Sequence, residues 1–133
     1  PGIYGVEFFV KGNEVIFSEL SPRPHDTGMV TLVSQNLNEF ELHLRAILNL
    51  PIPKITILKP SASRVILADE EFNNPSCTGL NEALEIEDTK VLIFGKPTSK
   101  KGRRMGVVLS SNVDINVARE NADNAALKIN IVS

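Results

Sequence analysis

A pair of short apolar runs separated by a turn constrains the fold more than any other feature of this sequence. The runs "YGVEFFV" (4–10) and "EVIFSEL" (14–20) are rich in β-branched and aromatic residues, and "KGN" lies between them. This pattern predicts a β-hairpin. Apolar neighbours such as Phe8 and Phe9 interrupt the alternation, so we expect both faces of the hairpin to be covered, as in an internal sheet.

Two carboxylates lie within this hairpin. If the hairpin is centred on Asn13, Glu7 faces Glu19. The same register pairs Phe9 with Phe17. The carboxylates would then lie about 5 Å apart and repel each other by about 3 kcal/mol at an effective dielectric constant of about 20. Protonation of one acid, a basic side chain between them (Arg23 is the nearest in sequence) or a bridging divalent cation would tolerate this repulsion. The alternative is a solvated edge hairpin with two surface acids.

The segment "SPRPHD" that follows the hairpin is stiff. Pro22 and Pro24 fix two φ angles and restrict the residues before them to extended conformations. Such a loop can hold Arg23, His25 and Asp26 in defined positions, as catalysis by positioning requires. A plain connection from strand to helix is the alternative.

Two helices are expected after this loop. Asp26 or Thr27 is an acceptable N-cap for the first helix. Asn38 caps the second helix, and Glu41 supplies its capping-box partner. The apolar stripe of the second helix follows the helical period: Phe40, Leu44, Ile47 and Leu48. The prolines in "PIPK" end this helix and form the best linker candidate.

The rest of the chain is expected to be rich in short strands. A further helix has Ser111 or Asn112 as its cap and carries Ile115, Ala118, Ala122 and Ala125 on one face. The segment "ALKINIV" ends in a last strand. We predict an α+β fold with one domain over 1–53 and a second over 54–133. The strands predicted in the second domain are 54–58, 63–68, 90–95 and 104–110.

Length and composition exclude several classes of protein. The chain has 133 residues, 42% of them hydrophobic, and a net charge of −2, which gives no reason to expect nucleic acid or membrane as a partner. Cys77, the only cysteine, reads as a loop residue and excludes an intrachain disulfide and a cysteine metal site. A reducing, cytoplasmic setting follows. Because the sequence begins at Pro1 and enters a strand at once, we expect it to be a piece of a longer protein.

Positive charge is concentrated in the stretch "KPTSKKGRR". It holds five of the 14 basic residues of the chain, including Lys96, Arg103 and Arg104. The ordinary interpretation of such a stretch is a solvated hairpin tip. Recognition of a phosphate is the functional reading, since arginine grips phosphate through paired N–H donors and Gly102 allows a sharp turn beside them.

These motifs together resemble one enzyme family. A strand with Glu, a turn and a strand that ends in Glu before x-Pro-Arg resembles the metal-binding hairpin of ATP-grasp enzymes. The longer string "SELSPRPHDTGMVTLVSQNLNEFELHLRAILNLP" is similar to the formate-dependent phosphoribosylglycinamide formyltransferases of purine biosynthesis. "FGKPTSKKGRRMGVVLS" resembles the C-terminal domain of that family. The resemblance implies the C-terminal part of an ATP-grasp domain followed by a small β-rich, barrel-sandwich-like domain.

The resemblance also implies roles for individual residues. Glu7 and Glu19 match the two carboxylates that hold Mg²⁺ against the phosphates of ATP. Arg23 matches a catalytic arginine that faces the phosphoryl-transfer centre, and Phe9 matches an apolar position of the adenine pocket. Positions that bind the ribonucleotide substrate are matched by Asp26, Lys96, Arg103 and Arg104.

The match also departs from the wider pattern. Ser21 stands where many ATP-grasp enzymes have an asparagine that helps to bind metal, although this family itself has serine there. The glycine-rich loop, the lysines and the hinge that hold ATP would precede Pro1, so the chain alone is expected to be inactive. His25 lines the site without an assigned role, and His43 is expected at the surface.

The resemblance implies an enzyme that uses ATP and formate to formylate glycinamide ribonucleotide, through formyl phosphate, and that forms a homodimer. The sister enzyme that carboxylates aminoimidazole ribonucleotide is an alternative because it shares "PRPH", but Asp26, Thr27 and Gly28 favour the transformylase. A non-catalytic binding or dimerisation module is the other alternative for this chain on its own.

Overall fold

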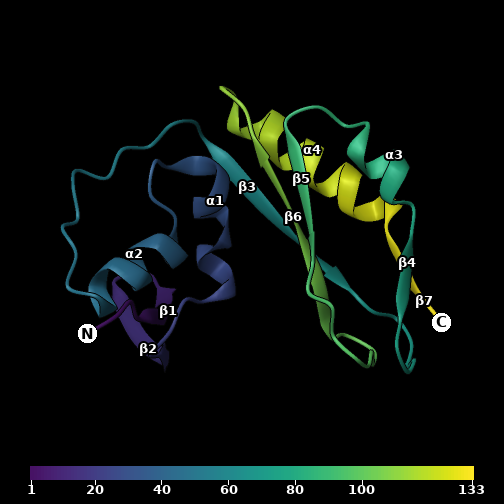
Figure 1. Cartoon of the computed structure of the whole chain (residues 1–133), viewed down its shortest axis with the longest axis horizontal. Coiled ribbons are helices and arrows are strands. Elements are labelled where there is room, and N and C mark those ends of the chain that lie inside the picture. Colours follow the sequence, from purple (N-terminus) through teal and green to yellow (C-terminus); the bar gives the residue numbers. More distant parts are fainter. The chain divides into compact units, whose positions relative to one another are not determined.

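The computed structural model describes all residues, 1–133, as two compact units (Figure 1). The N-terminal unit is Pro1–Leu58 and the C-terminal unit is Lys59–Ser133. Both combine helices with antiparallel strands, so the fold is a mixed α and β structure, as the sequence predicts. No helix has the length and apolar character needed to cross a membrane.

The N-terminal unit opens with the predicted hairpin. Strand β1 (Gly5–Lys11) pairs with β2 (Glu14–Ser21) in antiparallel fashion. Lys11 pairs with Glu14, so the turn has two residues rather than three. The first of them, Gly12, has a φ of +61°, a conformation that favours glycine.

A β-bulge changes the register partway along the hairpin. Near the turn Phe8 pairs with Phe17, so the predicted pairing of Phe9 with Phe17 is wrong. The register then shifts between Glu7 and Phe8, and the extra residue lies in β2. Beyond the shift Glu7 pairs with Glu19, as predicted. Without the bulge the two-residue turn would place Ser18 opposite Glu7 and would turn Glu19 to the other face.

Three helical segments follow the hairpin: η1 (Asp26–Val30), α1 (Thr31–Ser34) and α2 (Glu39–Ile47). The first is capped by the His25 side chain, which accepts from the Thr27 backbone N–H, and not by Asp26 or Thr27 as predicted. The capping box of α2 is confirmed, because Asn38 accepts from the Glu41 N–H and Glu41 accepts from the Asn38 N–H.

The remainder of the N-terminal unit holds little regular structure. The strand predicted over 54–58 is absent apart from one bridge between Ile57 and Gln35.

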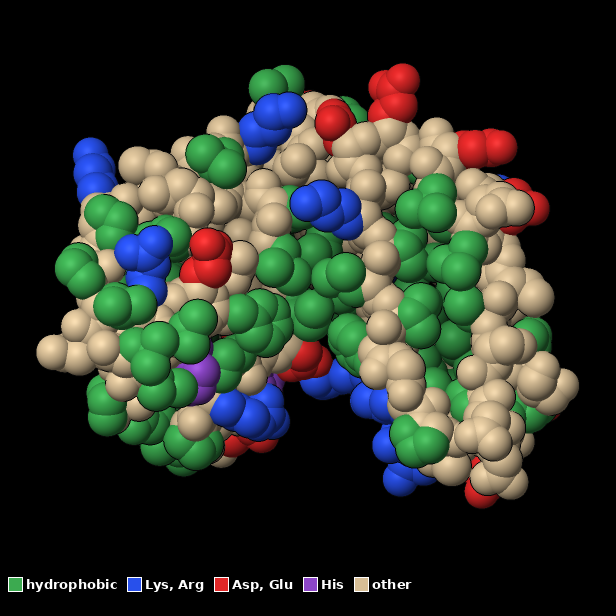
Figure 2. Space-filling model, in the orientation of Figure 1, with side chains coloured by type: hydrophobic (Ala, Val, Ile, Leu, Met, Phe, Trp, Pro, Cys, Tyr) green, Lys and Arg blue, Asp and Glu red, His purple; other side chains and the backbone are tan.

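The expectation that both faces of the hairpin are covered is not met within this chain, and Figure 2 shows many exposed hydrophobic side chains on this unit. The exposed apolar side chains of the hairpin are Val6, Phe8, Phe9, Val10, Val15, Ile16, Phe17 and Leu20.

The C-terminal unit is built on a three-stranded antiparallel sheet in the order β3-β6-β5. Its strands are β3 (Ser61–Leu67), β5 (Thr89–Ile93) and β6 (Arg104–Ser111). Three of the predicted strands are thereby confirmed to within a few residues. Residues 105–110 of the central strand are all buried; both edges of this strand are paired, and helices pack against one face of its sheet.

Helices α3 (Leu80–Leu84) and α4 (Ile115–Lys128) lie against one side of this sheet (Figure 1). The predicted alanine face of α4 is confirmed: small side chains let the helix approach the sheet closely. The core cluster is Ile66, Ala83, Val108, Ala122, Ala125 and Ile129. Asp114 caps α4 through the Asn116 N–H, so the predicted caps Ser111 and Asn112 are wrong.

A second, two-stranded sheet joins β4 (Ser76–Thr78) to β7 (Asn130–Val132). The predicted last strand is therefore confirmed. Cys77 pairs with Ile131 within this sheet and is not a loop residue as predicted. Its partner strand lies more than 50 residues further along the chain, so local sequence gives little sign of the pairing.

Gly79 joins β4 to α3 where the chain passes the end of α4, and we expect its replacement to be costly. Its φ is +80°, and an added Cβ would meet the Lys128 carbonyl group, with the carbon atom 2.8 Å away. Gly102 has a similar φ of +77° with no atom within 4 Å of a Cβ. Gly102→Ala should cost about 1–2 kcal/mol for the left-handed conformation alone. Gly79→Ala should cost about 1–3 kcal/mol more.

Urea unfolding of the three chains, followed by circular dichroism, measures this difference. If both variants lost the same free energy of unfolding, the Lys128 carbonyl group would move aside at no cost, and contact with α4 would not restrict Gly79.

Candidate functional site

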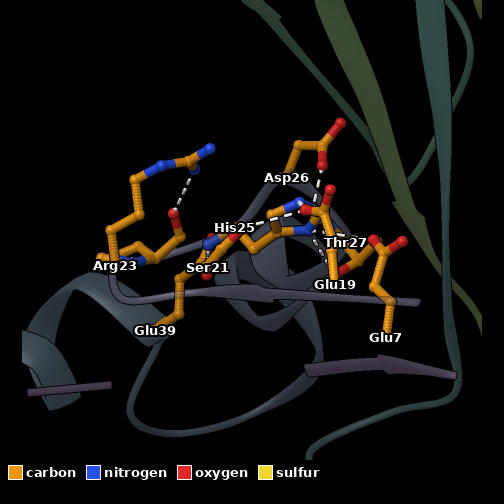
Figure 3. Close-up of polar contacts among 9 residues, drawn as sticks. Glu7, Glu19, Ser21, Arg23, His25, Asp26, Thr27 and Glu39 are labelled. Carbon is orange, nitrogen blue, oxygen red and sulfur yellow. Dashed lines mark hydrogen bonds and ion pairs between the residues drawn. The ribbon is translucent and has the colours of Figure 1, made fainter. Parts of the chain in front are cut away.

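The bulged hairpin and the loop after it bring three ligand-bearing side chains together (Figure 3). One oxygen each of Glu7 and Glu19 and one ring nitrogen of His25 lie within 4.8 Å of one another. His25 Nδ1 is 3.5 Å from Glu7 Oε1, and His25 Nε2 is 3.2 Å from Glu19 Oε1. The imidazole therefore lies against both carboxylates.

His25, and not Arg23, is thus the basic side chain beside the two acids. The Arg23 guanidinium donates to the Pro24 carbonyl oxygen at 3.0 Å and stays at the surface. Arg23 lies between the two prolines, and His25, after the second proline, is the residue that contacts the hairpin (Figure 3). A histidine two residues after a proline carries no specific signal, so sequence reasoning gave His25 no role.

The cluster is held by further polar contacts. Ser21 is buried, and its hydroxyl donates to Glu19 Oε1 at 3.0 Å. Asp26 Oδ1 lies 3.1 Å from His25 Nδ1, and the Thr27 hydroxyl lies 3.0 Å from the same nitrogen. A carboxylate on one ring nitrogen orients the ring and leaves the other nitrogen facing Glu19, an arrangement that is common beside metal ions.

The donor set of this cluster fits a hard divalent cation. Mg²⁺ takes carboxylate oxygens, keeps several waters and is commonly held by one or two carboxylates together with substrate phosphates. Glu7 is half-buried and Glu19 is exposed, so their oxygens are open to an incoming phosphate. The structure brings together the two residues predicted to bind metal, and their role as ligands stays a prediction.

Glu39, the first residue of α2, is a site residue that the sequence did not reveal. It is only 6% exposed, and its Oε2 accepts from the His25 backbone N–H at 3.0 Å (Figure 3). Burial raises the pKa of the Glu39 carboxyl above its ordinary value of 4.5, and nearby Asp26 adds to the effect. The hydrogen bond from His25 and the proximity of its ring act in the opposite direction.

The other predicted site residues lie as follows. Phe9 lies on β1 opposite Ile16 and is 65% exposed, so its ring is accessible to a ligand. Strands β5 and β6 pair as the sequence predicts, and their connection brings Lys96 beside Arg104, whose carbonyl oxygen accepts from Lys96 Nζ at 2.6 Å. Arg103 donates to the Thr98 carbonyl oxygen at 2.9 Å. The three predicted phosphate-binding cations thus share one connection of the C-terminal unit, whereas Asp26 belongs to the N-terminal unit.

Comparison with protein families agrees with this geometry. Residues 1–40 match the model of the ATP-grasp domain, which places the hairpin and its paired acids in the ATP-grasp class. Residues 61–129 match the model described as PurT, C-terminal. That second match covers 69 of the 133 residues, and the chain belongs to the PurT family.

Whole proteins that resemble the chain are considerably longer than it. The formate-dependent phosphoribosylglycinamide formyltransferase of Prochlorococcus marinus (strain MIT 9515) is 83% identical over 132 residues, which cover 99% of this chain and 34% of that protein. The chain therefore spans about a third of the length of this curated relative.

Two solved structures resemble the chain closely. Glycinamide-RNase-transformylase T from Mycobacterium tuberculosis matches with a TM-score of 0.75 and 35% identity over 97% of this chain and 33% of that one. N5-carboxyaminoimidazole ribonucleotide synthetase from Thermotoga maritima matches with a TM-score of 0.87 and 35% identity over 99% of this chain and 37% of that one.

The raised pKa of Glu39 predicts a specific pH dependence of stability. A group whose pKa is higher in the folded than in the unfolded chain favours folding below the unfolded pKa, and that contribution is lost as the pH rises through the folded pKa. Glu39→Gln removes the titrating group. The free energy of unfolding of Glu39→Gln relative to wild type should therefore increase as the pH rises above 4.5.

Urea unfolding of both chains between about pH 4 and pH 8 measures the effect, with Glu41→Gln on the same helix as control. A constant difference between Glu39→Gln and wild type across this range would show that the Glu39 carboxyl ionises equally well in the folded and unfolded chains.

Proposed function

We propose that this chain is the C-terminal part of an enzyme that uses ATP and formate to formylate the amine of glycinamide ribonucleotide in purine biosynthesis. The observation that carries the proposal is the pairing of Glu7 with Glu19 beside His25 in a chain of the PurT family. The names of the matched relatives support the choice of reaction. The proposed route is activation of formate as formyl phosphate, followed by attack of the ribonucleotide amine.

Glu7 and Glu19 would hold Mg²⁺ on the phosphates of ATP. A cation bound there shields the charge of the transferring phosphoryl group and fixes its oxygens for in-line transfer. Ser21 keeps Glu19 Oε1 in place through its hydroxyl, and the His25 ring lies against both acids. The hairpin thus supplies a preformed pair of ligands, which avoids the cost of ordering them during the reaction.

Arg23 and Phe9 complete the nucleotide side of the proposal. Arg23 is exposed and its guanidinium has only the Pro24 carbonyl oxygen as a partner among the contacts seen, so it can turn toward a phosphate. Phe9 is on the same face of β1 as Glu7, because side chains two residues apart share a face. It would pack against the adenine base.

The ribonucleotide would be held by charge. Lys96, Arg103 and Arg104 would bind its phosphate, since guanidinium groups match phosphate oxygens through paired donors. Asp26 would accept from its amino end. The thiol-poor composition supports a cytoplasmic setting for the enzyme, and homodimer formation is part of the proposal by resemblance alone.

The domain organisation forms part of the same proposal. Residues 1–53 would complete an ATP-grasp domain and residues 54–133 would form a barrel-sandwich-like domain, which the two separate antiparallel sheets of the C-terminal unit support. The parts that hold ATP would be supplied by the rest of the protein, so this chain by itself would be inactive. Within the whole enzyme it would serve as a binding module.

A second function is supported by the match to N5-carboxyaminoimidazole ribonucleotide synthetase, which has the same arrangement of elements. The corresponding reaction would carboxylate the amine of an aminoimidazole ribonucleotide. Steady-state assays of the full-length protein with each ribonucleotide separate the two functions. ATP turnover that depends on formate and glycinamide ribonucleotide supports the transformylase, and turnover that depends on bicarbonate and aminoimidazole ribonucleotide supports the carboxylase.

Glu19→Gln in the full-length enzyme tests the metal assignment. We expect it to remove most turnover, by about 100-fold or more, because a neutral amide is a poor ligand for Mg²⁺. Glu14→Gln is the matched control, since Glu14 lies on the same strand beside the turn and pairs with Lys11. The kcat of Glu14→Gln should stay near wild type. Retention of near-normal activity in Glu19→Gln would remove Glu19 from the metal site.

Arg103→Ala in the full-length enzyme tests the phosphate site. Loss of one charged hydrogen bond, worth about 1.5–3 kcal/mol, should raise the KM for the ribonucleotide roughly ten- to hundredfold and should affect the KM for ATP much less. Arg103 also bonds to Thr98, so Thr98→Val serves as a control that weakens this loop contact and keeps the cation. If the KM for ATP rose instead, the loop would bind the nucleotide.

A further inference from the structure

We propose that Glu39 is a positioning residue. Through a closed ring of hydrogen bonds it fixes the segment from His25 to Gly28, called the loop below, against α2. This keeps the His25 imidazole between Glu7 and Glu19. The proposal deepens the function proposed above and rests on it. Nothing in the resemblance between this chain and ATP-grasp enzymes assigned a role to this residue.

The ring consists of four hydrogen bonds that return to their starting residue. The His25 N–H donates to Glu39 Oε2 at 3.0 Å, and the Glu39 N–H donates to Thr31 Oγ1 at 2.9 Å. The Thr31 hydroxyl donates to the Gly28 carbonyl oxygen at 2.6 Å, and the Gly28 N–H donates to the His25 carbonyl oxygen at 2.8 Å. The side chain and the backbone of Glu39 both take part, so the residue joins the start of α2 to both ends of the segment from His25 to Gly28.

The fit between Glu39 and Gly28 is close. A Cβ on Gly28 would lie 2.7 Å from Glu39 Cδ, so only glycine leaves room for the carboxyl group in this position. The backbone of Gly28 does not have a positive φ, which means that its lack of a side chain matters here for space and not for conformation.

Open space adjoins one side of the loop. His25, Thr27, Gly28, Thr31 and Glu39 all line one cavity of about 290 Å³. No packed side chains fill this space, so on this side the hydrogen bonds of the ring restrain the backbone of the loop.

Burial of Glu39 is difficult to explain by stability alone. Its second oxygen, Oε1, is buried without a hydrogen-bond partner, and such groups destabilise the folded state. A glutamate at the first position of a helix can instead point to solvent and still interact favourably with the helix dipole. The buried position of this carboxyl is therefore explained by its hydrogen bond to the loop, and the His25 ring of that loop contacts both acids of the hairpin.

The experiment compares three variants of the full-length enzyme with wild type. Glu39→Ala breaks the ring, Glu39→Gln keeps an oxygen that accepts from the His25 N–H, and Glu41→Ala removes a carboxylate from the same helical turn without touching the loop. Hydrogen exchange of the peptides that cover residues 22–30 reports on the loop directly, and kcat and KM are measured for ATP and for the ribonucleotide. Thermal melting shows that each variant is folded.

We expect Glu39→Ala to speed exchange in residues 22–30 at least tenfold and to lower kcat roughly ten- to hundredfold, with the KM for ATP changed less than threefold. Glu39→Gln should exchange as wild type does and lose less than about threefold in kcat. Glu41→Ala should lower the melting temperature as much as Glu39→Ala or more, with unchanged exchange in the loop.

Two results would overturn the proposal. If Glu39→Gln behaved as Glu39→Ala does, the charge of the carboxylate would be required and the hydrogen bond to His25 would not suffice. If Glu39→Ala kept wild-type exchange and kcat, the loop would not depend on the ring. Both results differ from failure of the proposed function, in which the wild-type enzyme itself would show no turnover that depends on formate and ribonucleotide.

Discussion

The electrostatic repulsion between Glu7 and Glu19 is the constraint on which the N-terminal unit depends. The bulge in β2 forces the two carboxylates onto one face of the hairpin, and the chain then places His25 against both of them. The stiff "SPRPHD" segment, the ring of hydrogen bonds around Glu39 and the buried Ser21 all hold that arrangement. A site with two adjacent carboxylates and an imidazole against both suits a cation that arrives with its own phosphates.

Much of this arrangement could be predicted from the sequence because it depends on local patterns. The hairpin, the capping box of Asn38 and Glu41 and the alanine face of α4 all follow from spacing over a few residues. The pairing of Glu7 with Glu19 was predicted correctly from a uniform register that the structure does not have. A shorter turn and a compensating bulge give the same pairing near the acids and a different one at Phe8 and Phe17.

What the sequence could not show depends on contacts between distant residues. The His25 backbone N–H donates to Glu39, which lies 14 residues later, and the His25 ring rather than Arg23 lies beside the acids. Cys77 is in a strand because of Ile131. Conversely, residues 54–58 have strand propensity but pair only through one bridge, because no neighbouring strand is available to pair with them.

The central claim is that the hairpin presents Glu7 and Glu19 together as ligands for a divalent cation on a nucleotide. Crystals of the full-length protein grown with Mn²⁺ and ADP test it through the anomalous signal of the metal. The account predicts a peak about 2.0–2.3 Å from an oxygen of each glutamate and from a phosphate oxygen, with the His25 ring moved away from at least one carboxylate. A metal peak that touches neither glutamate, with both contacts to His25 intact, would contradict it.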